Sequence, residues 1–247
     1  MGMPFNLLAM KKLFFYVLFL SILTTVQSCI YINSEDNIPL RGVTTQTFGL
    51  RDFDQLEMDN AFRVTVRAGS GYAVSAKGEL NDLDDLNIFV SEGKLVVRYK
   101  NSWRKRQAMD IDITMPQLKS IDFSGAVDGD VAGFESNGTI DFELSGASRC
   151  SFSGSANTLE FDLDGASQLN LSGESRFLDG ELSGASKLEA SNWLAEESDL
   201  NLSGASTARI WISRLLDVEA SGASTVRYKG NPSVKQELSG GSTLRKE

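Results

Sequence analysis

Carboxylate side chains recur in this sequence at a spacing that could support binding chemistry. They stand three and five residues before the glycine of a repeated Ser-Gly-Ala motif or a close variant of it, and eleven of these fourteen positions are acidic. Carboxylate oxygens suit Ca²⁺, and a row of negative charges also suits a cationic partner. We call this set the acidic ladder, and its members are Asp122, Asp141, Glu143, Glu160, Asp162, Asp179, Glu181, Asp199, Asp217, Glu219 and Glu237.

Two interpretations of the acidic ladder stay open. Like charges directly across neighbouring strands destabilise a sheet, so such a row calls for an explanation. It could bind a divalent cation weakly, or a cationic or cation-bridged partner. It could instead be a solvated face that keeps a Gly- and Ala-rich β protein soluble and prevents sheets from aggregating. Nothing matches the Gly-Gly-x-Gly-x-Asp calcium motif, so we predict no defined metal site.

Nucleophilic catalysis is not expected. The chain has no histidine, which removes Ser-His-Asp and Cys-His systems and the usual imidazole metal sites. Serines such as Ser145 and Ser183 recur with the repeat, so turn hydrogen bonding explains them better than a nucleophile does. We therefore predict no catalytic residues, no cofactor and no enzymatic activity.

One basic and aromatic cluster stands apart from the repeats. It includes Trp103, Arg104, Lys105 and Arg106, between two segments with the alternation of strands. These side chains could contact an anionic glycan or lipid head group. The alternative is a solvated hairpin loop with no ligand.

The N-terminus has the organisation of an export signal. Lys11 and Lys12 precede an apolar run over 13–23, which is too short to span a membrane. The run leads to Val26-Gln27-Ser28-Cys29, which resembles the lipobox of bacterial lipoproteins. We expect a signal peptide over 1–28, lipidation of Cys29 and a tether over 29–47. The protein is then exported and anchored by lipid to the outer membrane, facing the periplasm or the cell surface.

Charge excludes one class of partner. Beyond residue 28 the chain carries 33 acidic and 22 basic residues, a net charge of −11. Such a surface repels the phosphates of nucleic acids, so no nucleic-acid binding is expected.

The spacing of the glycines indicates the fold that positions these side chains. Gly125, the first of seven motif glycines, is followed at steps of 21, 19, 19, 20, 18 and 18 residues. A fixed period near 20 is typical of a solenoid in which each repeat forms one coil. Apolar columns flank each glycine and alternate with polar ones, as in strands with one face inward. We predict an all-β solenoid domain over 48–247, with a β-rich N-terminal part over 48–118 and the repeats over 119–247.

Two details follow from the alignment of the repeats. Cys150 shares a column with Leu169 and Leu188, so it is expected to be a buried, inert thiol. A second corner is expected eight residues after the glycine, at Gly154, Gly173, Asn192 and Gly230, because Gly and Asn tolerate positive φ.

Two stretches of the sequence resemble a known family. The first includes Phe53 to Met58, Ala61 to Val66 and Gly93 to Val97, and the second is the Leu-Ser-Gly-Ala-Ser run, as at Leu144 to Ser148. They are similar to Bacteroidetes envelope proteins described as "putative auto-transporter adhesins" with a head GIN domain. The resemblance implies a right-handed parallel β-helix and a suspected role in adhesion. It implies no catalytic residues and no particular partner.

Three functions are compatible with these sequence features. The first is an adhesin-like module that binds a cell-surface glycan or protein through an extended face. The second is a polysaccharide lyase or hydrolase, which would need carboxylates and a basic residue clustered once in a groove. The third is a structural envelope protein without a ligand. Even, in-register carboxylates favour the first.

Overall fold

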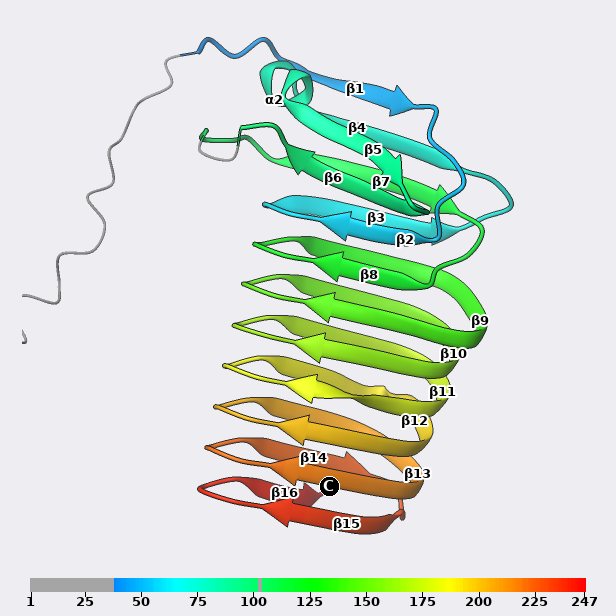
Figure 1. The fold of residues 1–247 in the computed structure, drawn as a ribbon, viewed down its shortest axis with the longest axis vertical. Coiled ribbons are helices and arrows are strands. Elements are labelled where there is room, and N and C mark those ends of the chain that lie inside the picture. The colour runs from blue at the N-terminus through cyan, green and yellow to red at the C-terminus, as the bar shows by residue number, and fades with distance from the viewer. Residues whose placement is uncertain (1–37, 102–103) are drawn as a thin grey trace, which may run out of the picture. The chain divides into compact units, whose positions relative to one another are not determined.

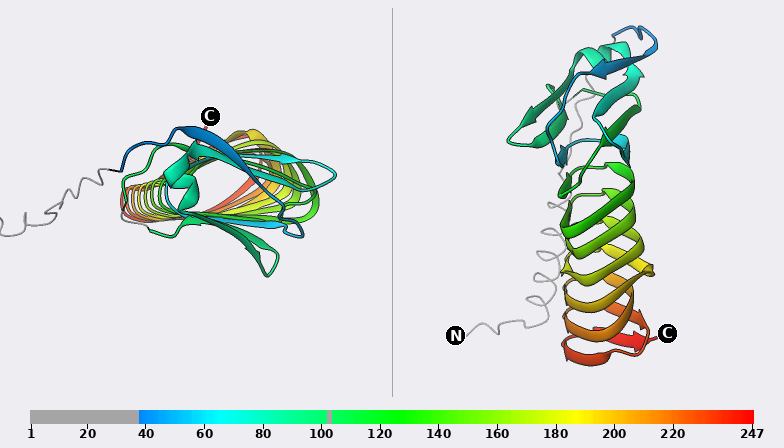
Figure 2. Two further views of the ribbon diagram at one scale, coloured as in Figure 1. Left: turned by 90° about the horizontal axis from the view of Figure 1, so that it is seen from above. Right: turned by 90° about the vertical axis from the view of Figure 1, so that its right-hand side faces the viewer.

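The computed structural model describes residues 38–101 and 104–247, and the unit over Pro39–Glu247 is a right-handed parallel β-solenoid of about seven turns. This confirms the predicted fold class. Each coil contributes a strand to each of two long sides (Figures 1 and 2). The repeat strands are β8 (Ser120–Phe123), β9 (Asp128–Leu144), β10 (Arg149–Leu163), β11 (Gln168–Leu182), β12 (Lys187–Leu202), β13 (Thr207–Ala220), β14 (Thr225–Lys229), β15 (Ser233–Leu238) and β16 (Thr243–Lys246).

The Ser-Gly-Ala motif forms the sharp corner of each coil. Gly165 has φ +74°, a left-handed conformation that glycine adopts without steric cost. The following residue, Ala166, donates its N–H to the carbonyl oxygen of Gly146 in the preceding coil at 2.7 Å. A Cβ on Gly165 would lie 2.7 Å from that same oxygen, so stacked corners approach too closely for a larger residue.

The second corner lies where the sequence predicts it, but for a partly different reason. Strands β9 to β13 pass through it without interruption, with shifts of register between neighbours, for example at Ser153/Gly154. Gly173 and Gly230 have φ of +141° and +96°, whereas Gly154 and Asn192 are not among the positive-φ residues. At Gly154 a side chain is excluded by lack of space, because a Cβ there would lie 2.3 Å from the carbonyl oxygen of Phe134.

The N-terminal part of the domain continues the solenoid out of chain order. Its strands are β1 (Val43–Phe48), β2 (Gln55–Met58), β3 (Phe62–Ala68), β4 (Ala73–Glu79), β5 (Leu86–Ser91), β6 (Lys94–Tyr99) and β7 (Met109–Met115). Strands β2 and β3 pair in parallel with β8 and β9 on one side, and with β6 and β7 on the other. The first coil in the sequence is therefore the second in space, inserted between β6–β7 and β8–β9.

Antiparallel elements close this end of the solenoid. Strand β4 pairs antiparallel with β7 and β1, and β5 pairs antiparallel with β6. A short helix, α2 (Leu80–Asp84), connects β4 to β5. Strand β1 begins at Val43, so the expected tether over 29–47 is too long: residues 43–47 form part of the domain because their backbone groups pair with β4.

The core fills the space between the two long sides. The predicted inward columns are buried in most coils but not in the last one, and Cys150 is 0% exposed, as expected. Rings from the two long sides meet in the core: the centroids of Phe142 in β9 and Phe152 in β10 are 5.2 Å apart, and the rings are tilted by 55°. Serines two residues after the corner glycine are also buried, and Ser206 and Ser224 each donate a hydrogen bond of 2.8 Å to a carbonyl oxygen of their own turn. Turn hydrogen bonding therefore accounts for Ser206 and Ser224, whereas Oγ of the buried Ser167 has no hydrogen-bond partner. Within the described residues, no helix has the length and apolar character needed to span a membrane.

Candidate binding surface

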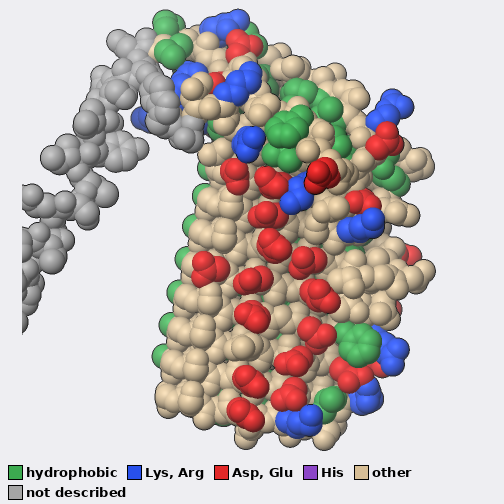
Figure 3. Space-filling model, in the orientation of Figure 1, with side chains coloured by type: hydrophobic (Ala, Val, Ile, Leu, Met, Phe, Trp, Pro, Cys, Tyr) green, Lys and Arg blue, Asp and Glu red, His purple; other side chains and the backbone are tan. Residues whose placement is uncertain are grey.

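The acidic ladder forms two parallel columns on one long side of the solenoid. Asp141 pairs with Glu160 and Glu143 with Asp162 across β9 and β10, and the same register continues through β11, β12 and β13. Because strands in a sheet lie about 4.8 Å apart, like charges are stacked at that spacing down the face. Figure 3 shows the result as a band of acidic side chains running down the molecule.

Two further residues belong to this surface and were missed in the sequence. Strand β2 places Glu57 beside Asp122, one coil above the first member of the acidic ladder. Lys94 of β6 is in register with Gln55, and its Nζ lies 3.1 Å from Oε2 of Glu57. The sequence did contain a signal for Glu57. Asn60 occupies the corner position of its coil, with φ +80°, and Glu57 stands three residues before it, as ladder members stand before the motif glycine. Aligning Asn60 with the motif glycines would have extended the column.

Lysines neutralise the ends of the acidic ladder but not its middle. Lys94 is at one end, and at the other Nζ of Lys235 lies 3.3 Å from Oδ2 of Asp217. In the described part of the chain, no Lys or Arg nitrogen forms an ion pair within 4.0 Å with the members between these two ends. The central carboxylates, some half-buried and some exposed, therefore have no paired cation among the described residues.

Several of these carboxyl groups hold protons more tightly than usual. Burial, and next the charges of Glu143 and Glu160, raise the pKa of Asp141 to about 6. Burial is also the largest cause that raises the pKa of Asp122, with Glu143 next. Burial raises the pKa of Asp179 as well, against a hydrogen bond from the backbone of Asp199. Repulsion between neighbouring carboxylates thus contributes to these raised pKa values, but loss of hydration contributes more.

The opposite long side carries mixed charge. Arg63 and Asp110 lie 2.6 Å apart, and Arg67 and Asp130 lie 2.5 Å apart. Further along, Arg209 approaches Glu189 at 3.4 Å. Opposite charges are interleaved on this face, so its field is weak compared with that of the acidic ladder.

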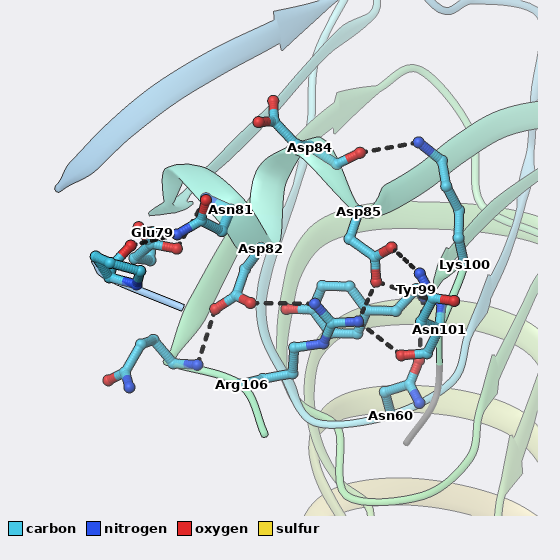
Figure 4. A network of polar contacts seen from close by, with 12 residues as sticks. Asn60, Glu79, Asn81, Asp82, Asp84, Asp85, Tyr99, Lys100, Asn101 and Arg106 are labelled. Atoms are coloured by element: carbon cyan, nitrogen blue, oxygen red, sulfur yellow. Dashed lines mark hydrogen bonds and ion pairs between the residues drawn. The ribbon is translucent and has the colours of Figure 1, made fainter. Parts of the chain in front are cut away.

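The basic and aromatic cluster, here called the basic loop, is joined through Arg106 to the antiparallel strands and α2 at the N-terminal end of the solenoid, here called the N-terminal cap. Arg106 is therefore not the ligand contact that the sequence predicted. Arg106 pairs with Asp82 at 3.1 Å and with Asp85, and its guanidinium lies 4.2 Å from the ring centroid of Tyr99 (Figure 4). Its side chain is 12% exposed, so it is not available to a ligand. The guanidinium of Arg106 has enough N–H donors to bind the carboxylates of Asp82 and Asp85 at the same time.

The other members of the basic loop differ in their placement. Lys105 is exposed and Arg104 is partly buried. Trp103 lies outside the described residues. The expectation of a ligand contact at this loop therefore rests on Lys105 among the described side chains.

The grooves of the described surface are open and shallow. One, of about 560 Å³, lies at the second corner and is lined by Glu174, Arg176 and Glu196 among small polar residues. This is the grouping that most resembles the needs of a lyase. Arg176 and Glu196 are 3.9 Å apart, and more than half of each side chain is exposed. A general acid or base is normally tuned by exclusion of water, which this groove does not provide.

The described residues show no cation site of ordinary design. No three acidic or cysteine side chains among them come together in a way that could hold a metal ion. Adjacent ladder members are spread along a flat sheet, whereas Ca²⁺ takes six to eight oxygen ligands around one point. Cys29, the expected lipidation site, lies outside the described residues.

Comparison with known proteins decides the family. The sequence profile described as "Putative auto-transporter adhesin, head GIN domain" matches residues 52–232, most of the solenoid. The chain belongs to this family. The head GIN match covers both the out-of-order N-terminal coils and the repeats, so the two parts form one family domain.

Solved structures share the head GIN fold at low identity. A "putative adhesin" from Bacteroides fragilis is 18% identical, with a TM-score of 0.77, covering 85% of this chain and 99% of that one. One from Parabacteroides distasonis is 16% identical, with a TM-score of 0.68 and coverage of 83% and 97%. A "putative lipid binding protein" from the same species is 16% identical, with a TM-score of 0.62 and coverage of 85% and 99%. These similarities establish the fold alone. No curated protein matches the chain.

Proposed function

We propose that this head GIN protein is an adhesin-like binding protein of the cell envelope, without catalytic activity. Its ligand is a cell-surface protein or glycan that carries cationic groups. The observation that supports the proposal is the acidic ladder: two columns of in-register carboxylates with no paired cation between Lys94 and Lys235 among the described residues.

The geometry of the acidic ladder suits a repeating partner. Carboxylates recur at about 4.8 Å along the axis of the solenoid, so an extended cationic chain can meet several at once. Each exposed contact contributes little, but several on one partner act together and raise the overall affinity. Binding of this kind weakens as salt concentration rises, because exposed charges are screened.

The test is binding to immobilised polylysine and to chitosan oligomers, with dextran as a neutral control. The test variant combines Glu143→Gln, Asp162→Asn and Glu181→Gln. The matched control changes three exposed carboxylates away from the acidic ladder, namely Asp128→Asn, Glu135→Gln and Glu174→Gln. The proposal expects at least tenfold weaker binding for the first variant and little change for the second. Equal loss in both variants would show that net charge alone attracts the probe.

The alternative proposal is that a divalent cation binds the acidic ladder and bridges it to an anionic partner in place of a cationic one. The test is thermal unfolding in Ca²⁺ against NaCl of matched ionic strength. A ligand that binds the folded state raises the unfolding temperature, so Ca²⁺ should raise it beyond the salt control and should not do so in the ladder variant. Equal effects of the two salts would remove cations from the proposal.

Anchoring at Cys29 is the second part of the proposal. It is supported by the apolar run over 13–23 and the Val-Gln-Ser-Cys sequence that follows. Mass spectrometry of the mature N-terminus should find a diacylated or triacylated Cys29. A mature chain that begins with unmodified Cys29, or at any other residue, would contradict it.

A further inference from the structure

The last coil of the solenoid leaves one edge of each sheet open. Strand β15 pairs with β13, and β16 pairs with β14. Among the described residues, no strand pairs with the other edge of either. All six residues of β15 are exposed. The opposite end of the domain is covered by antiparallel strands and α2, so the two ends are unlike (Figure 1).

Alternate residues of β15 turn their backbone groups to this open edge. Ser239 and Thr243 donate their N–H groups to the preceding coil at 2.9 Å. Because a parallel strand directs alternate residues to each neighbour, Lys235 and Glu237 bond to β13. Val234, Gln236 and Leu238 therefore present free N–H and C=O groups at the edge.

The same three residues also continue the inward columns. Val234 stacks on Leu216 and Leu238 stacks on Ala220, both of which are buried. At the edge, however, Val234 is 36% exposed and Leu238 is 40% exposed. An unpaired edge with exposed apolar side chains is a template for a further strand.

We propose that a second copy of this chain supplies that strand, with the two β15 strands paired antiparallel about Gln236. Val234 then lies opposite Leu238 of the partner subunit, and each Gln236 lies opposite the other. On the outer face, Lys235 lies opposite the partner's Glu237, and the reverse pair forms by symmetry. These outer residues form the pairs without backbone hydrogen bonds, in which side chains of an antiparallel sheet lie closest.

Charge selects this register over its neighbours. Sliding one strand along the other by two residues in either direction preserves the backbone hydrogen bonds but changes which side chains meet. One shift places Lys235 opposite its own copy, and the other places Glu237 opposite its own copy. Like charges directly opposed are unfavourable, so the arrangement centred on Gln236 is the self-complementary one. On the other sheet, pairing of β16 about Leu244 opposes Arg245 to Thr243, without a clash of like charges.

The dimer places the two N-terminal caps at its far ends. This consequence is independent of the ligand of the acidic ladder. If each copy is anchored at Cys29, as proposed above, two copies joined in this way would link two facing membranes rather than lie side by side in one.

The test uses the full chain with Cys29→Ser, which prevents lipidation, in sedimentation equilibrium over a range of concentrations. We expect a monomer–dimer equilibrium that Glu237→Lys shifts at least tenfold toward monomer. The double variant Lys235→Glu with Glu237→Lys should restore it. The control Glu143→Lys makes the same change in the same column, far from the edge, and should leave it unchanged. A monomer at all concentrations, or a dimer insensitive to Glu237→Lys, would overturn the proposal.

Folding and register are checked separately. In the monomer, Glu237→Lys relieves repulsion from Glu219, its register partner, so thermal stability should hold or rise while dimerisation falls. Gln236→Cys should form a disulfide-linked dimer on mild oxidation, because opposed residues in such a pair lie about 5.5 Å apart at Cα. Val234→Cys should not, because the two copies would be about 13 Å apart. Cross-linking by Val234→Cys but not Gln236→Cys would exclude this register.

Discussion

Asn60 holds the corner position directly above Gly125. Ala126, the residue after Gly125, donates its N–H to the carbonyl oxygen of Asn60 at 2.7 Å, and a Cβ on Gly125 would lie 2.8 Å from that oxygen. Both residues have positive φ, +80° and +79°. The column of corners thus extends one coil beyond the Ser-Gly-Ala motif, with asparagine in place of glycine.

The corner column predicts which glycines cannot be replaced. Gly184→Ala should lower the free energy of unfolding by about 2 kcal/mol or more, since alanine is disfavoured at positive φ and its Cβ would lie 2.6 Å from the carbonyl oxygen of Gly165. Asn60→Gly, in the same column, should change it by less than about 1 kcal/mol. Chemical denaturation measures both. Equal effects would mean that corner conformation does not limit stability.

The raised pKa of Asp141 predicts a pH dependence of stability. The folded value of about 6 exceeds the ordinary 3.8, so the folded state binds the proton more tightly than the unfolded chain. The free energy of unfolding should therefore fall as pH rises from about 4 to about 6. Asp141→Asn should reduce this slope and add about 1 kcal/mol of stability at pH 7, a value discounted for screening by solvent.

The cause of that pKa can be separated by a second substitution. Glu160→Gln removes one of the neighbouring charges but leaves Asp141 buried. An NMR titration of the Asp141 carboxyl carbon should show a pKa lowered only part of the way toward its ordinary value. Titration of wild-type Asp141 near 4 would contradict both predictions.

The buried thiol of Cys150 is expected to be inert. It is 0% exposed, and burial raises its pKa. Thiol reagents should label it only as fast as the solenoid opens. Cys150→Asp should cost several kcal/mol, because it buries a charge with no partner, whereas Cys150→Ala should cost less. Rapid labelling of the native protein would show that this column is not inward.

Arg106 is expected to stabilise the N-terminal cap rather than to bind a ligand. Burial raises the pKa of Asp85, but hydrogen bonds from Asn101 and Arg106 outweigh that effect and hold it below its ordinary value. Arg106→Met should destabilise the cap by about 3 kcal/mol, because it leaves two largely buried carboxylates without their cation. Faster hydrogen exchange in β6 and α2 measures this. The control Lys105→Met removes an exposed charge and should have little effect.

Sequence reasoning succeeded where each coil contacts the next coil along the chain. The inward columns, the acidic ladder from Asp122 to Glu237 and the burial of Cys150 follow from one period, because every coil repeats the same corner and pairs in the same register. Local pattern and long-range pairing coincide in such a fold.

Only the tertiary structure decided the features that break this rule. The order β6–β2–β8 places a strand between two others that follow it in the sequence, and no local period encodes that insertion. Arg106 reaches Asp82 and Asp85 only when the chain closes over α2, so its role differs from that of an exposed loop residue. The raised pKa of Asp141 likewise depends first on how far its carboxyl group is removed from water. Residue types and spacing determine which side chains share a column, whereas burial and closure of distant segments determine what each of them can do.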